Sequence, residues 1–390
     1  METARALLGA LYRAALAGAD PEAAVFRALA EPAVARVLAQ ARSIGIFAAG
    51  KAAARMARGA RSVAARRALV VLPRGHSAEG IPKRRIVFAA HPEPDASSVR
   101  AARAALRFFG DFGEGDVILC LVSGGASSLV CLPRKGLTLA AKRRAVAALA
   151  ESGASILALN RLRTSLSAVK GGRLGRATRA RLVTFALSDV PGDRAAAVGS
   201  GPTVRGRRGD VVRIVGSNRD GLDAAEREAR RLGWRVRRGS GRLSGPARTA
   251  GERIGRAMAT LPPRTVQLSG GETLVRLDRA RSRGGRSLEL ALGAARTGAG
   301  GDWALLAAGS DGRDGSSTAA GAFADGSTLA RARGLGLDAG DALVRHDTHR
   351  FFSKLGDLLV TGPTGTNVGD WVFAARGSPR PGPVKGRQPI

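Results

Sequence analysis

Aromatic residues and cysteine are scarce in this chain of 390 residues. Phe, Trp and Tyr together make up 4% of it, and Tyr12 is the only tyrosine. The core must therefore be built from Val, Leu, Ile and Ala, and the aromatic signature of common RNA-binding modules is missing. The only cysteines, Cys120 and Cys131, lack zinc-ligand spacing and are too few for a disulfide-stapled secreted domain, so we expect a reducing compartment.

Long apolar runs are also missing. No segment has the roughly 20 continuous apolar residues that span a bilayer. The first 25 residues contain Arg13, lack the apolar centre of a signal peptide, and predict an amphipathic helix that ends near Asp20-Pro21. We therefore expect a cytoplasmic protein with no membrane association.

Lysine and acidic residues are few beside arginine. The chain has seven lysines, 56 arginines and a net charge of +32. This charge could reflect a nucleic-acid partner, or only the arginine- and alanine-rich composition that a high-GC genome produces. Because the arginines are spread along the whole chain, we favour the second explanation and expect no specific nucleic-acid partner. The charge still favours anionic substrates.

Apolar strands alternate with helical segments, which predicts a parallel sheet covered by helices on both faces. The expected strands of a first domain are 43–50, 68–73, 85–90, 116–123, 182–188 and 211–218, and two helices are expected to fill 138–169. A second set of strands is expected at 265–273, 274–278, 303–310, 357–367 and 371–375, with a small-residue helix near 317–324. A chain of 390 residues is longer than a domain with a single hydrophobic core usually is.

We therefore predict two α/β domains, the first a Rossmann-like α/β/α domain, with a cleft between them. The polar, glycine-rich stretch 238–250 is the best candidate linker. The expected boundaries are 1–240 for the N-terminal domain, 241–262 for a linker and connecting helix, 263–376 for the C-terminal domain and 377–390 for a disordered basic tail.

Two glycine-rich acidic turns follow buried strands, at 184–193 and 305–315. Ligands of open α/β sheets bind outside the carboxyl ends of the strands. Single aspartates in turns are usually turn residues. Two such turns nevertheless indicate hard oxygen ligands for a magnesium–phosphate substrate. The carboxylates concerned are Asp189, Asp193, Asp311 and Asp314.

Two further strand exits carry residues suited to phosphate. Lys51 directly follows the glycine that ends the first strand, although Ala52 stands where a phosphate loop needs a hydroxyl. The segment 123–128, SGGASS, offers backbone N–H groups to an oxyanion through Ser123, Gly124, Gly125 and Ser127, unless it is simply a tight turn.

Cations recur in two other segments. Arg163 and Lys170 are seven residues apart, which predicts one helix face that either clamps a carboxylate or phosphate or is simply solvated. Arg286 opens a helix after two glycines and could approach a phosphoryl group. Asn367 lies in another strand-exit loop of small and hydroxyl residues, TGPTGTN.

Together these motifs resemble the glycerate 2-kinase family, which has an N-terminal glycerate-kinase domain and a C-terminal MOFRL domain. The resemblance spans residues 6–375 and rests on AAGKAA, HPEPDASS, LVSGGASSL, LRTSLSAVKGGRL, LSDVPGD, GSGPT, GSNRDGL, SGGET, RGGRSLELAL, AAGSDGRDG and TGPTGTNVGD in that order. It implies phosphorylation of D-glycerate by ATP and Mg²⁺ at the 2-hydroxyl, giving 2-phosphoglycerate. The oligomeric state, monomer or homodimer, stays open.

The resemblance assigns two roles: Lys51 matches a catalytic lysine and Arg286 its arginine partner. We further expect the other candidates to serve the same reaction, with Asp189 as the preferred acceptor of the hydroxyl proton. Asp193, Asp311 and Asp314 would hold Mg²⁺. The residues that would bind substrate or phosphate are Ser123, Gly124, Gly125, Ser127, Arg163, Lys170, Glu272 and Asn367.

The chain departs from the family pattern at Ser287, Leu288 and Thr318. Two alternatives to D-glycerate phosphorylation therefore stay open. The protein could be a kinase for another small hydroxy acid, or a catalytically weakened homologue that binds nucleotide or metabolite.

Overall fold

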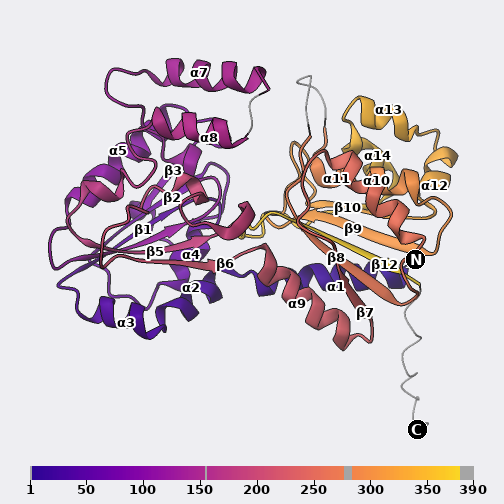
Figure 1. The fold of residues 1–390 in the computed structure, drawn as a ribbon, viewed down its shortest axis with the longest axis horizontal. Helices are drawn as coiled ribbons and strands as arrows, with labels where there is room; N and C mark the ends of the chain where they lie inside the picture. The colour runs from indigo at the N-terminus through magenta and orange to yellow at the C-terminus, as the bar shows by residue number, and fades with distance from the viewer. Residues whose placement is uncertain (1, 154–155, 276–282, 378–390) are drawn as a thin grey trace, which may run out of the picture. The chain divides into compact units, whose positions relative to one another are not determined.

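The computed structural model describes residues 2–153, 156–275 and 283–377. They divide into two compact units. The parallel-sheet unit comprises residues 19–218 and 365–368, and the mixed-sheet unit comprises residues 2–18, 219–364 and 369–377. Each is described by itself (Figure 1). The expected α/β class with two sheets is confirmed.

The parallel-sheet unit contains a six-stranded sheet in the order β3-β2-β1-β4-β5-β6, which is the Rossmann order. All its strand pairs are parallel. The strands are β1 (Ile44–Ala49), β2 (Arg67–Pro73), β3 (Ile86–Ala89), β4 (Val117–Val122), β5 (Arg181–Leu187) and β6 (Val211–Gly216). The central strand β4 is buried along its whole length, as expected for a sheet covered on both faces.

Helices cover this sheet on both faces, with α2 and α4 packed together on one and α5 on the other (Figure 1). The helices are α2 (Pro21–Leu29), α3 (Pro32–Ala39), α4 (Ala53–Gly59), α5 (Ala96–Gly110), α6 (Ala126–Leu129), α7 (Leu139–Glu151) and α8 (Ile156–Ser165). Short 3₁₀ turns lie at η1 (Lys83–Arg85), η2 (Gly175–Ala177), η3 (Pro191–Asp193) and η4 (Val198–Ser200).

The mixed-sheet unit contains a second six-stranded sheet in the order β11-β10-β9-β12-β8-β7. Its strands are β7 (Arg235–Arg238), β8 (Thr265–Gly271), β9 (Trp303–Gly309), β10 (Gly321–Asp325), β11 (Leu358–Leu359) and β12 (Asp370–Arg376). The helices of this unit are α1 (Glu2–Gly18), α9 (Asn218–Arg231), α10 (Ala247–Met258), α11 (Arg286–Thr297), α12 (Thr328–Gly334), α13 (Ala339–Val344) and α14 (Thr348–Leu355). The α10–α11 pair and the sheet share one apolar core.

The N-terminal helix α1 belongs to the mixed-sheet unit although the sequence places it in the first domain. Tyr12 packs edge-on against Trp371 of β12 and donates a hydrogen bond of 2.8 Å to the Gly309 carbonyl. Gly221 of α9 also meets Trp371, because a Cβ there would lie 2.2 Å from the indole ring. Both helices therefore cover this sheet, and the unit boundary falls between residues 218 and 219 rather than near 240.

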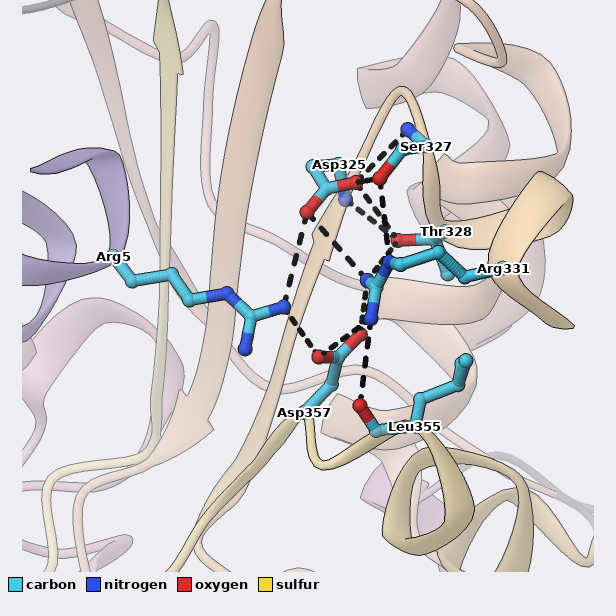
Figure 2. Close-up of polar contacts among 7 residues, drawn as sticks. All are labelled: Arg5, Asp325, Ser327, Thr328, Arg331, Leu355 and Asp357. Atoms are coloured by element: carbon cyan, nitrogen blue, oxygen red, sulfur yellow. Dashed lines mark hydrogen bonds and ion pairs between the residues drawn. The ribbon is translucent and has the colours of Figure 1, made fainter. Parts of the chain in front are cut away.

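An ion-pair cluster fixes α1 to this unit (Figure 2). Asp357 has no exposed side-chain surface and pairs with Arg5 of α1 and Arg331 of α12. Asp325 lies 3.8 Å from Arg5 and 3.6 Å from Arg331. Two guanidinium groups thus compensate two buried carboxylates, which would otherwise be costly to remove from water.

Two local expectations are wrong, and a third lies partly outside the described residues. The helix expected at 317–324 is instead strand β10, which pairs with β9. The interval 238–250 is part of the mixed-sheet unit, with Leu243 bridged to Gly271 and α10 beginning at Ala247. The strand expected at 274–278 runs beyond the described residues, and Leu274 forms only an isolated bridge to Pro246. No helix in the described ranges is long and apolar enough to cross a bilayer.

Candidate functional site

The reversal of strand order in the parallel sheet lies between β1 and β4. Loops that leave the carboxyl ends of two such strands diverge to opposite faces and open a crevice for ligand. Here those loops are 50–52 after β1 and 123–125 after β4, which contain the two motifs singled out from the sequence. The topology therefore brings Lys51 and the SGGASS segment to one edge.

Backbone and side-chain hydrogen bonds join the two loops. The Lys51 N–H donates to the Gly124 carbonyl at 2.9 Å, and the Ala52 N–H donates to the Ser123 hydroxyl at 3.1 Å. Gly50 has a φ of +131°, and a Cβ there would lie 2.1 Å from the Ser123 hydroxyl oxygen. Only glycine allows this approach, which sets where the lysine leaves the strand.

A carboxylate and an amide meet the second loop. A Cβ on Gly124 would lie 2.0 Å from Asp189 Oδ2 and 2.1 Å from Asn367 Nδ2. The Asn367 amide donates to Asp189 Oδ2 at 3.1 Å, which orients the carboxylate. The Lys51 stem lies nearby, 3.3 Å from where a Cβ on Gly125 would stand. Residues from four separate motifs thus converge.

A cavity of about 890 Å³ opens beside these loops within the parallel-sheet unit. Gly124, Gly125, Ser127 and Asp189 line it, and α7 supplies much of another wall. Its other polar or charged lining residues are His91, Glu93, Ser128, Cys131, Lys142, Arg143, Arg144, Asn160, Arg163, Lys170 and Ser200. Such a volume is ample for a small-molecule substrate.

Arg163 and Lys170 both line this cavity, but they do not share a helix face as expected. Helix α8 ends at Ser165, and Lys170 lies in the turn beyond it. Lys170 is 4% exposed, and its ammonium donates a hydrogen bond to Ser127. The pKa of Lys170 is lowered to about 8, chiefly by burial and also by the neighbouring charges of Lys142 and Arg163. The solvated-face alternative is therefore wrong for Lys170.

A second group of predicted residues lies in the mixed-sheet unit. Arg286, the first residue of α11, binds Asp370 through two nitrogens and also pairs with Glu272. Burial raises the pKa of Asp370 above its ordinary value, while the Arg286 guanidinium opposes that rise. Asp370 therefore orients Arg286 through a fork-to-fork pair.

The predicted metal ligands are divided between the units. Asp193 accepts a hydrogen bond of 2.6 Å from the Ser188 hydroxyl in the parallel-sheet unit. In the mixed-sheet unit Asp311 accepts one from the Arg313 N–H at 3.1 Å, as in an Asx turn. Among the described residues, no group of three or more His, Cys, Asp or Glu side chains is arranged to hold a metal ion.

Asp314 caps a helix. Its two oxygens accept hydrogen bonds from the Ser287 and Leu288 N–H groups at 3.0 and 2.8 Å, at the start of α11. Burial raises its pKa to about 7, although these two amides favour the charged form. The carboxylate therefore satisfies N–H groups that the helix leaves without partners.

Two of the residues that depart from the family pattern lie in different environments. Leu288 is fully buried in the core of the mixed-sheet unit, and Thr318 is exposed.

Sequence reasoning missed Lys142 of α7 and Asp370 of β12. Lys142 stands in an Arg- and Ala-rich helix with no motif around it. Its one signal is the scarcity of lysine, because Lys142 and Lys170 are two of only seven lysines and line the same cavity. Asp370 begins the last strand, where its carboxylate looks like an ordinary strand terminus.

Two family models match the chain. Residues 7–225 match a domain of unknown function (DUF4147), and residues 265–370 match the MOFRL family. D-glycerate 2-kinase of Thermotoga maritima is 34% identical over 373 residues, which cover 84% of this chain and 89% of that protein. A putative hydroxypyruvate reductase of Agrobacterium vitis is 39% identical over 333 residues, covering 73% of this chain and 86% of that protein.

The fold is similar to a solved structure. A crystal structure of glycerate kinase from Thermotoga maritima aligns with a TM-score of 0.83 and 32% sequence identity. The alignment covers 96% of this chain and 100% of that one.

Proposed function

The chain belongs to the glycerate kinase family of small-molecule kinases, and we propose that it phosphorylates D-glycerate with ATP and Mg²⁺. In this reaction the 2-hydroxyl oxygen of D-glycerate attacks the terminal phosphorus of ATP. The bond from that phosphorus to the bridging oxygen breaks, ADP leaves, and the product is 2-phosphoglycerate. The convergence of Lys51, Gly124 and Asp189 at the switch point carries the proposal.

Asp189 is the proposed acceptor of the hydroxyl proton. Its carboxylate lines the cavity, and the Asn367 amide holds one of its oxygens. A base must lie within hydrogen-bond reach of the proton that it removes. A carboxylate oriented by an amide at a cavity wall suits that task.

Phosphoryl transfer is mostly positioning and neutralisation of charge. Lys51 follows a glycine whose close contact with Ser123 sets the direction of the chain, so it is proposed to meet the transferred group. Lys170 and Arg163 line the cavity and are proposed to hold the substrate carboxylate. Lys170 is held in place before substrate arrives by its hydrogen bond to Ser127.

The aspartates of the two acidic turns offer suitable oxygen ligands for Mg²⁺. This ion keeps several waters and needs only one or two carboxylates beside the substrate phosphates, so the lack of a three-carboxylate cluster among the described residues is compatible with it. Asp193 and Asp311 are the candidate ligands, while capping occupies Asp314. Bound Mg²⁺ would neutralise phosphate charge. The role of Arg286 as the partner of Lys51 stays a prediction.

Product analysis tests the reaction. The protein is incubated with ATP, Mg²⁺ and D-glycerate, and ³¹P NMR distinguishes 2-phosphoglycerate from 3-phosphoglycerate. L-glycerate and tartronate serve as alternative acceptors, and NADH or NADPH with hydroxypyruvate tests the activity in the name of the Agrobacterium relative. Faster turnover of another acceptor, or reduction without phosphorylation, would contradict the proposal.

The variant Lys51→Met tests the proposed site. We expect kcat to fall by about 10²- to 10³-fold, the usual effect of removing one group that stabilises transition-state charge. Lys83→Met is the matched control, since Lys83 is exposed in η1. Equal rates for both variants, with unchanged circular dichroism, would remove Lys51 from the mechanism.

A further inference from the structure

The wall of the cavity formed by α7 has an unusual feature. Lys142 is the only buried residue of this helix, and it is 4% exposed. A surface helix normally buries an apolar stripe against its own protein. Here apolar residues of α7, among them Leu139, Val146 and Ala150, line the cavity instead. The helix therefore directs both its apolar side chains and a lysine toward the ligand space.

The Lys142 ammonium lacks a hydrogen-bond partner among the described residues. Burial and the nearby Arg163 lower the pKa of Lys142, and the adjacent Cys131 thiol opposes this only in part. An ammonium out of water and without an acceptor is costly, and proteins seldom retain one without a counterion. This position therefore indicates an anion that the chain itself does not supply.

Three cations surround the same space. The positive charges of Lys142 and Arg163 both lower the pKa of Lys170, and no carboxylate is prominent among the charges that shift this pKa. The two acidic residues of the lining are committed elsewhere, Glu93 to Arg143 at an exposed position and Asp189 to Asn367. The net field at this end of the cavity is positive.

The position of this group relative to Asp189 selects the kind of anion. Lys170 donates to Ser127, which lies three residues after Gly124, the residue that Asp189 contacts. In a 2-hydroxy acid the carboxylate is bonded to the carbon that carries the reacting hydroxyl. A cation group that lines the same cavity as the base therefore suits the acceptor's carboxylate.

We propose that Lys142, with Lys170 and Arg163, forms a buried oxyanion subsite that binds the carboxylate of a 2-hydroxy acid and makes that carboxylate a requirement for substrates. This inference rests on the proposed function and adds a specificity residue on α7. Neutral polyols such as glycerol would leave three cations without an anion and be rejected.

The test compares a charged ligand with a neutral one. D-glycerate and D-glyceramide differ only in carboxylate against carboxamide, and isothermal titration calorimetry without nucleotide measures their binding. We expect the wild-type protein to prefer D-glycerate by 100-fold or more. Lys142→Met should weaken D-glycerate binding and raise its KM by about 30- to 100-fold, the usual loss for a charge-assisted hydrogen bond. Glyceramide binding and the KM for ATP should change less than threefold.

Two control variants keep the outcome interpretable. Lys135→Met removes an exposed lysine just before α7 and should leave all constants unchanged. Lys142→Arg keeps the charge and should retain most of the preference for D-glycerate.

Each outcome has a distinct meaning. Equal weakening of D-glycerate and D-glyceramide by Lys142→Met would reduce Lys142 to a structural residue and overturn the inference. A rise in the KM for ATP instead would make the anion a nucleotide phosphate and also overturn it. Failure of the wild-type protein to bind or phosphorylate D-glycerate would overturn the proposed function together with this subsite.

Discussion

Replacing Lys170 with methionine is expected to stabilise the parallel-sheet unit while weakening substrate binding. The pKa of Lys170 falls from 10.5 to about 8 in the folded protein, chiefly through burial. That difference corresponds to about 3 kcal/mol of unfavourable free energy for the buried ammonium. Loss of the hydrogen bond to Ser127 offsets about 1 kcal/mol. The net expected gain at pH 7 is therefore about 2 kcal/mol.

The gain should depend on pH in a defined direction. Below pH 8 the lysine is protonated in both states, so the full cost of the buried charge is present. Between pH 8 and 10.5 the unfolded chain binds the proton and the folded protein does not, so wild-type stability rises with pH. The advantage of Lys170→Met should therefore shrink by about 1.4 kcal/mol per pH unit above pH 8 and disappear near pH 9.5.

Hydrogen exchange of the β4 and β5 amides is a suitable assay. All three tryptophans, Trp234, Trp303 and Trp371, lie in the mixed-sheet unit, so their fluorescence would report on the wrong part of the chain. Opening free energies are compared at pH 7 and 9.5, with Lys83→Met as the exposed control. A variant less stable than wild type at pH 7, or a difference independent of pH, would refute the argument that the ammonium is buried at a cost.

Two other substitutions probe close packing and the ion-pair cluster. Gly124→Ala should push the Asp189 carboxylate from its place and lower kcat at least 100-fold in a steady-state assay. Gly110 has open space around it, so Gly110→Ala should leave kcat unchanged. Similar rates for the two variants would refute the close approach of Gly124 and Asp189. Arg5→Met should destabilise the mixed-sheet unit by about 1–2 kcal/mol, because buried Asp357 loses one of its two arginines. Urea unfolding followed by tryptophan fluorescence measures this change. An unchanged midpoint would mean that the pair of Arg5 and Asp357 contributes nothing to stability.

The strands that border the candidate site could be predicted because their signals are local. β1, β4 and β5 are short apolar runs that end at glycine or a polar turn, so both strand and loop could be located from the sequence. β10 could not, since Gly321, Ala322 and Ala324 have little intrinsic strand preference. Pairing with β9 decides its conformation, and Gly321 is needed because a Cβ there would lie 1.8 Å from the Ala307 carbonyl oxygen.

The site residues divide in the same way. Lys51 and Asp189 could be proposed because each follows a strand exit, where parallel sheets bind ligands. Lys142 could not, because a lysine on a helix is normally solvated and nothing nearby in the sequence marks it as buried. Its importance depends on which side of α7 faces the cavity, and this follows from how α7 packs in the unit.

The sequence by itself determined the α/β class, most strands and the polar loops at their ends, since apolar runs and glycine punctuation act over a few residues. Tertiary structure alone decided three other features: the contact between Gly124 and Asp189, the packing of α1 against the second sheet, and the burial of Lys142 beside Lys170. The physical reason is that burial and electrostatic coupling depend on distance in space, and residues far apart in a chain acquire that distance only when the sheets and helices pack.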